Sequence, residues 1–181
     1  MNAKELFDIA ARNKVIAAIK EAELNTSGEI RLHVEDRCKE DVMDHATFIF
    51  EKLEMHKTEL RNGVLFYIAL EDRKFAILGD AGINKVVAND FWEQTRDLVF
   101  SYLKKGDIIA GLSEGIKLAG VQLKEHFPYQ SNDINELSLT KSLKNVTEFS
   151  IFENEENELS SLGFYLKQHP IKKVEIGRAH V

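Results

Sequence analysis

Residues 63–70 are the stretch that most constrains the fold, an almost continuous apolar run with the sequence GVLFYIAL. A strand with one face in water alternates apolar and polar residues, so a continuous run is expected where a strand is covered on both faces. A second apolar run follows at residues 75–78, after the four-residue connection EDRK, and this spacing predicts an antiparallel hairpin. The chain must therefore supply elements for both sides of this hairpin.

The segments before the hairpin have the periodicities of helices and of one further strand. Residues 4–23 and 40–56 carry apolar residues at helical spacing, and residues 29–35 alternate as a half-buried strand does. Because this strand reaches residues 63–70 through a helix, we expect the two strands to be parallel.

Three more helices are expected after the hairpin, at residues 83–87, 90–103 and 107–126. Asp90 and Asp107 stand where the second and third of these helices begin, and aspartate is a common N-cap residue. Helices that alternate with strands in this way predict an α/β layer structure, in which helices cover a small mixed sheet.

Charge and composition exclude several classes of partner. The formal net charge of −6 argues against nucleic acid, because phosphate binding needs a clustered basic face, and it also disfavours anionic membranes. No apolar stretch approaches the roughly 20 residues of a membrane helix, and the charged N-terminal segment does not read as a secretory signal. Cys38 is the only cysteine, so no internal disulfide is possible. We expect a soluble, cytoplasmic protein without membrane insertion.

The pattern of the sequence changes toward its end. Residues 1–138 are expected to form one α/β domain, whereas residues 139–174 combine an acidic, Asn-rich stretch with short apolar pieces. This tail is interpreted as the start of a second module, a spurious fusion or a mobile tail. Residues 175–181, EIGRAHV, can be written GAG ATC GGA AGA GCA CAC GTC, which looks like the start of a sequencing adapter. We interpret them as adapter read-through, with a natural basic tail as the alternative, and exclude them from fold reasoning.

The predicted hairpin brings polar residues from separate loops to one edge of the sheet. Asn62 precedes its first strand and Asp80 follows its second, so these two residues are expected near one another. Ser27 lies toward the same edge if the strand at residues 29–35 is parallel, and Asp90 follows ten residues after Asp80. Oxygen ligands on glycine-bounded loops suit a hard cation. The hypothesis is a calcium or magnesium site formed by Asp80 and Asp90, with Asn62 assisting.

A purely structural interpretation competes with this hypothesis. Asp80 would occupy a turn and Asp90 would cap a helix, as aspartates commonly do, and spacing alone favours this interpretation. The stretch Gly79-Asp80-Ala81-Gly82 is neither a dinucleotide fingerprint nor a P-loop, so nucleotide binding has little support.

The cysteine and the histidines predict no further site. Cys38, His45 and His56 do not have the spacing of zinc ligands, and no phosphatase-type arginine loop follows Cys38. His33 lies on the strand face opposite Ile30, where it is either exposed or covered by a helix. The sequence identifies no nucleophile-and-base pair.

Four motifs give the chain a family resemblance. SGEIRLHVE, RNGVLFYIALEDRKFAILGDAGI, DFW and LKKGDIIAGLSEGI occur in this order, at separations that resemble those of the TPM-domain family, also called thylakoid acid phosphatase-like or photosystem II repair-like. The resemblance covers residues 4–138, and its compact form is similar to single-domain members from Bacteroidetes-type bacteria.

The resemblance implies a Rossmann-like three-layer sandwich, a small mixed sheet with helices on both faces. For several members it implies binding of calcium or another divalent cation, and plant members have been described as acid phosphatases. Asp90 matches an aspartate of the family, whereas Arg61 and Asn84 stand where many members have acidic residues. These departures imply a weaker cation site or a ligand set shifted toward Asp80.

The functional hypothesis is a TPM-domain module that binds a divalent cation, calcium or magnesium, with an unidentified protein as a further possible partner. The alternative is a metal-assisted acid phosphatase, in which the metal would polarise the phosphoryl group or activate water. Because no nucleophile-and-base pair is identifiable, binding without turnover is the preferred expectation.

Overall fold

The computed structural model describes residues 3–129 and 177–180. Its helices are α1 (Ala3–Leu6), α2 (Ile9–Glu23), α3 (Val42–Lys52), the 3-10 helix η1 (Met55–Lys57), α4 (Ala81–Asn84), α5 (Phe91–Leu103) and α6 (Ile108–His126). Its strands are β1 (Glu29–Glu35), β2 (Gly63–Ala69), β3 (Lys74–Gly79) and β4 (Gly177–His180). The α/β fold class is confirmed.

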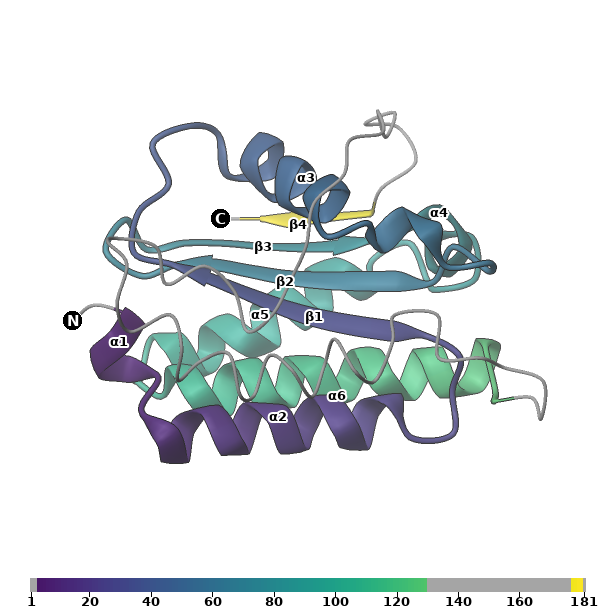
Figure 1. Ribbon diagram of the computed structural model, residues 1–181, viewed down its shortest axis with the longest axis horizontal. Helices are drawn as coiled ribbons and strands as arrows, with labels where there is room; N and C mark the ends of the chain where they lie inside the picture. Colours follow the sequence, from purple (N-terminus) through teal and green to yellow (C-terminus); the bar gives the residue numbers. More distant parts are fainter. Residues whose placement is uncertain (1–2, 130–176, 181) are drawn as a thin grey trace.

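The described strands form one sheet in the order β1-β2-β3-β4 (Figure 1). β1 and β2 are parallel, with Glu29 opposite Gly63, and β2 and β3 form the antiparallel hairpin, with Val64 opposite Gly79. Both predicted pairings are confirmed. They bring the start of β1, the start of β2 and the end of β3 to one edge of the sheet.

Helices cover both faces of the sheet (Figure 1). On one face, Ile30, Leu32 and Phe66 belong to a core that includes residues of α2, α5 and α6. On the other face, Leu65 and Tyr67 pack with apolar residues of α3. Every residue of β2 is buried, as the apolar run at 63–70 predicts. The three layers are therefore confirmed, while the closer Rossmann-like description stays a prediction.

Two local expectations are wrong. The helix expected at residues 4–23 is interrupted, because Asp8 caps α2 by accepting a hydrogen bond from the backbone nitrogen of Ala11 at 2.7 Å. β1 is not half-buried, since Glu29, Arg31 and His33 on its polar face are also buried. The charged side chains on this face pair with one another, so they can be buried away from water.

The last helices begin close to their predicted positions. The carboxylate of Asp107 accepts from the backbone nitrogen of Ala110 at 3.4 Å, so Asp107 is the N-cap of α6. Asp90 occupies the corresponding position before α5 but makes no side-chain capping bond. The helix expected at residues 83–87 begins earlier, because Asp80 caps α4 at Ala81.

β4 adds four residues from the chain end to the edge of β3, with Gly177 opposite Gly79. This pairing does not address how residues 175–181 arose, so adapter read-through stays a prediction. Residues 130–176 lie outside the described residues, and the expectations for the 139–174 tail fall there. Within the described part of the chain, no helix has the length and apolar character to cross a membrane.

Candidate metal site

Two segments meet at the end of the sheet where β2 begins and β3 ends. We call this place the rim and define it by residues 61–63 and 79–84. The backbone nitrogen of Asp80 donates to the carbonyl oxygen of Gly63 at 2.9 Å. The side-chain nitrogen of Asn62 donates to the hydroxyl of Ser27 at 3.3 Å. The structure thus brings Asn62, Asp80 and Ser27 together, as the topology predicts.

Asp80 is fully buried, and both of its carboxylate oxygens are paired. Oδ2 accepts from Nε of Arg61 at 2.7 Å, and Oδ1 accepts from Nη2 of Arg61, also at 2.7 Å. Oδ1 accepts in addition from the backbone nitrogen of Ala81 at 2.7 Å, which caps α4. Asp80 is therefore the N-cap of α4, where the structural interpretation expected a turn residue, and Arg61 is its partner in a bidentate ion pair.

Asn62 is buried beside this pair, with an exposed fraction of 1%. Its backbone nitrogen donates to the hydroxyl of Thr58 at 3.1 Å, which fixes the loop. Its side-chain oxygen Oδ1, by contrast, is buried and accepts no hydrogen bond in the part of the chain that the structure describes. An unpaired buried acceptor costs about 1–3 kcal/mol, and in native proteins it commonly marks the place of a water molecule or an ion.

Asp90 does not join the other two predicted ligands. Its side chain is exposed, and Oδ2 accepts from the side-chain nitrogen of Gln94 at 2.7 Å. No hydrogen bond or ion pair within residues 3–129 and 177–180 connects it to Asp80 or Asn62. The structure therefore brings together two of the three predicted ligands.

Asn84 ties the start of α5 to the rim. Its side-chain nitrogen donates to the carbonyl oxygen of Gly79 at 2.8 Å, and its side-chain oxygen accepts from the indole of Trp92 at 2.8 Å. The indole also packs so closely on Gly79 that a Cβ there would lie 2.3 Å from it. Asn84 is thus a bridge between β3 and α5.

A second polar group lies toward the other end of β1, and sequence reasoning missed it. We call it the histidine cluster: His33, Glu35, Glu40, His45 and Tyr67. One oxygen of Glu35 contacts Nε2 of His33 at 2.9 Å, and the other contacts Nε2 of His45 at 2.8 Å and accepts from the Tyr67 hydroxyl at 2.7 Å. Nδ1 of His45 contacts the carboxylate of Glu40.

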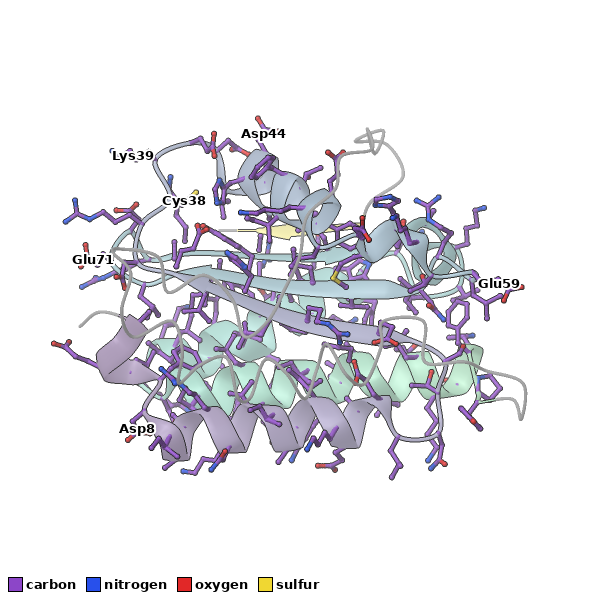
Figure 2. All side chains as sticks on the ribbon, in the orientation of Figure 1. Asp8, Cys38, Lys39, Asp44, Glu59 and Glu71 are labelled. Atoms are coloured by element: carbon purple, nitrogen blue, oxygen red, sulfur yellow. The ribbon has the colours of Figure 1, made fainter. Side chains whose placement is uncertain are left out.

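The rim and the histidine cluster occupy opposite ends of the sheet. In the register of the parallel pair, Glu29 faces Gly63 at the rim, whereas Glu35 faces Ala69. Figure 2 shows the same separation, with Glu59 before the rim at one end and Cys38 before α3 at the other. A histidine and a glutamate two residues apart on one strand face, with a tyrosine opposite, were the available sequence signal.

Hydrogen bonding sets the charges in the cluster. Burial alone would raise the pKa of Glu35, but the hydrogen bonds from His33, His45 and Tyr67 outweigh it and lower that pKa. The bond to Glu35 raises the pKa of His45, against the effect of burial, and the contact with Glu40 adds to the rise. Burial and the bond to Glu35 both raise the pKa of the Tyr67 hydroxyl. Near neutral pH, Glu35 is therefore ionised and Tyr67 is protonated.

Neither region is a ready-made cage of histidine, cysteine and carboxylate ligands. Within the described ranges, 3–129 and 177–180, no three such side chains are arranged to hold a metal ion. A cation at the rim would instead use amide and backbone oxygens together with Asp80, a ligand set that suits calcium.

Comparison with known proteins identifies a family and similar solved structures. The family described as the TPM domain matches residues 1–122. In the solved NMR structure of the BA42 protein from the psychrophilic bacterium Bizionia argentinensis, the similar chain is 44% identical, with a TM-score of 0.68. The match covers 74% of this chain and 92% of that one. No curated protein matches.

Proposed function

Because the chain belongs to the TPM domain family, we propose that it is a divalent-cation binding module, with calcium as the preferred ion and Asn62, Asp80 and Asp90 as ligands. One observation carries the proposal. The rim holds a buried amide oxygen, Oδ1 of Asn62, that has no hydrogen-bond donor among the residues the structure describes, and the preceding residue is the arginine that binds a buried carboxylate. A cation would satisfy that oxygen and use the neighbouring negative charge.

The proposed ligands offer the kinds of oxygen atom that calcium binds. Calcium takes six to eight oxygen ligands in flexible geometry, and backbone carbonyls and waters commonly complete its shell. Asn62 would contribute its amide oxygen and Asp80 its carboxylate. Asp90 is exposed, and within the described part of the chain its side chain bonds to Gln94, so it can exchange that surface bond for the ion.

Magnesium fits this ligand set less well. It demands nearly ideal octahedral geometry and loses its water reluctantly, whereas the three proposed ligands lie before β2, after β3 and before α5. Asp80 and Asn62 are buried and Asp90 is exposed. We therefore expect calcium to bind more tightly than magnesium.

Binding is proposed here without turnover. A metal-assisted phosphatase needs a nucleophile or an activated water with a proton acceptor beside the ion. The paired imidazoles and carboxylates of the histidine cluster lie toward the other end of β1. An ion at the rim would instead link the loop before β2 to the loop after β3, as expected for a binding or regulatory module.

The test is a calcium titration of the full chain, followed through backbone amide resonances. We expect saturable shifts at residues 61–63 and 79–90, reduced in Asp80→Asn and Asp90→Asn. Asp107→Asn is the matched control for Asp90→Asn, because Asp107 is also an exposed aspartate at a helix start. Indifference of the rim to millimolar calcium would refute the proposal. Phosphatase activity lost in Asp80→Asn and Asp90→Asn would replace it with the enzymatic alternative.

A further inference from the structure

The guanidinium of Arg61 binds the carboxylate of Asp80 through two parallel hydrogen bonds. Nε and Nη2 each lie 2.7 Å from a different carboxylate oxygen, the fork geometry in which guanidinium binds carboxylate most strongly. The Asp80 side chain has no exposed surface, whereas 39% of the Arg61 side chain is exposed. The guanidinium therefore covers a buried anion from the side that faces water.

Hydrogen bonds hold the backbone of Arg61, whereas part of its side chain is exposed. The carbonyl oxygen of Arg61 accepts from the backbone nitrogens of Gly82 at 2.7 Å and Ile83 at 3.3 Å. A Cβ at Gly82 would lie 1.9 Å from the carbonyl oxygen of Leu60, so this contact requires glycine. Arg61 itself has a φ of 51°, a left-handed conformation that the surrounding bonds hold in place.

We propose that Arg61 is a built-in competitor of the divalent cation, whose guanidinium occupies Asp80 until a cation displaces it toward water. This inference rests on the proposed function, and it adds how the same site is regulated. It explains how a fully buried aspartate can serve as a ligand: the site holds a tethered monovalent cation in the place that a divalent one would take.

The proposal has a quantitative consequence for affinity. A ligand that binds only the uncovered state has its apparent dissociation constant raised by the reciprocal of the uncovered fraction. If Arg61 covers Asp80 in about nine molecules of ten, removing its side chain tightens calcium binding about tenfold. Displacement also breaks the two hydrogen bonds between the guanidinium and Asp80. The Nε–H group of Arg61 therefore changes environment when calcium binds.

Arg61→Gly and Arg73→Gly form a matched pair for the test. Both remove one positive charge, and both residues are left-handed, with φ of 51° and 53°, so glycine relieves the same backbone conformation at each site. Arg73 lies in the exposed turn between β2 and β3, away from the rim. Calcium affinity of the full chain is measured by calorimetry. We expect it to rise about tenfold in Arg61→Gly and to stay within about twofold in Arg73→Gly.

The Nε–H resonance of Arg61 in the wild-type chain gives a second readout, which decides the question if Arg61→Gly does not fold. We expect it to shift during the calcium titration together with the amide of Asp80. If calcium binds at the rim while affinity is equal in both variants, or while the Nε–H resonance stays unchanged, Arg61 is not a competitor and the proposed function stands alone. If calcium leaves the rim amides unchanged in wild type and in Arg61→Gly, the proposed function itself fails.

Discussion

The rim and the histidine cluster each centre on one carboxylate, Asp80 with no exposed side-chain surface and Glu35 with 23% exposed, and they pair it in different ways. Glu35 receives hydrogen bonds from three side chains that belong to β1, β2 and α3. Asp80 is paired with one side chain, that of Arg61, which is 39% exposed, and the neighbouring Asn62 oxygen has no donor among the described residues. One anion is held by fixed partners and the other by a partner that can leave.

This difference distinguishes a structural polar cluster from the place at which we propose cation binding. A polar network that pairs residues of several elements stabilises one arrangement of those elements, although Nδ1 of His33 is buried without a hydrogen-bond partner among the described residues. A buried anion with one movable partner, next to an unpaired acceptor, can exchange that partner for a ligand. We therefore ascribe the docking of α3 to the histidine cluster, and the rim is the place at which we propose cation binding.

The largest expected effect is on stability, in Glu35→Ala. The change leaves the buried donors of His33 and Tyr67 without their acceptor, and we expect the free energy of unfolding to fall by about 3 kcal/mol. Urea unfolding at neutral pH measures it. Glu40→Ala is the control, with an expected loss below about 1 kcal/mol, because the Glu40 side chain is 61% exposed. Equal losses would contradict the structural role of Glu35.

Asp80→Ala is expected to cost less, about 2 kcal/mol, although Asp80 is the more deeply buried carboxylate. The variant loses the α4 cap, but the exposed Arg61 side chain can turn to water and stay solvated. The same urea experiment compares it with Glu35→Ala. A loss larger than that of Glu35→Ala would show that Asp80 is structural and remove the contrast between the two regions.

The contribution of the histidine cluster to the free energy of unfolding should also depend on pH. The bond to Glu35 raises the pKa of His45, so the folded state binds this proton more tightly than the unfolded chain does. The stabilisation is fully present below the unfolded pKa, near 6.5, and is lost as pH rises through the raised pKa of the folded state. We expect wild type to exceed His45→Gln in unfolding free energy by about 1 kcal/mol at pH 6, and by less at pH 9. A difference that grows with pH would contradict this account.

The smallest effect on stability is expected for Asp90→Asn. Asp90 makes no capping bond to α5, so we expect a change below about 0.5 kcal/mol in thermal or urea unfolding. Asp107→Asn removes the anion that caps α6 and serves as the comparison. Calcium affinity should respond in the opposite order, falling severalfold only in Asp90→Asn. If Asp90→Asn is neutral in both measurements, Asp90 is not a ligand.

The sequence predicts the strands, the helices and the strand pairing, because these follow from local patterns. The apolar run of β2, the hairpin that joins it to β3 and the helix before it are sufficient to bring Asn62 and Asp80 together. The parallel pairing of β1 and β2 follows from the helix between them.

The partners of buried charges are not local, and here sequence reasoning is incomplete. In the sequence, Arg61 stands where many members of the family have an acidic residue, and it is interpreted there only as a loss of negative charge. In the structure its guanidinium binds Asp80, nineteen residues away. His45 meets Glu35 only because of how α3 packs on the sheet, which no periodicity encodes. The polar face of β1 looks exposed by alternation but is buried through such pairs.

The most direct test of the central claim is the side-chain amide resonance of Asn62 during a calcium titration of the full chain. We predict a saturable shift of this resonance, together with the backbone amide of Asp80, while the resonances of His33 and His45 stay unchanged. Asn62 resonances that do not move up to about 10 mM calcium, or saturable shifts confined to the histidine cluster, would contradict the assignment of the rim as the cation site.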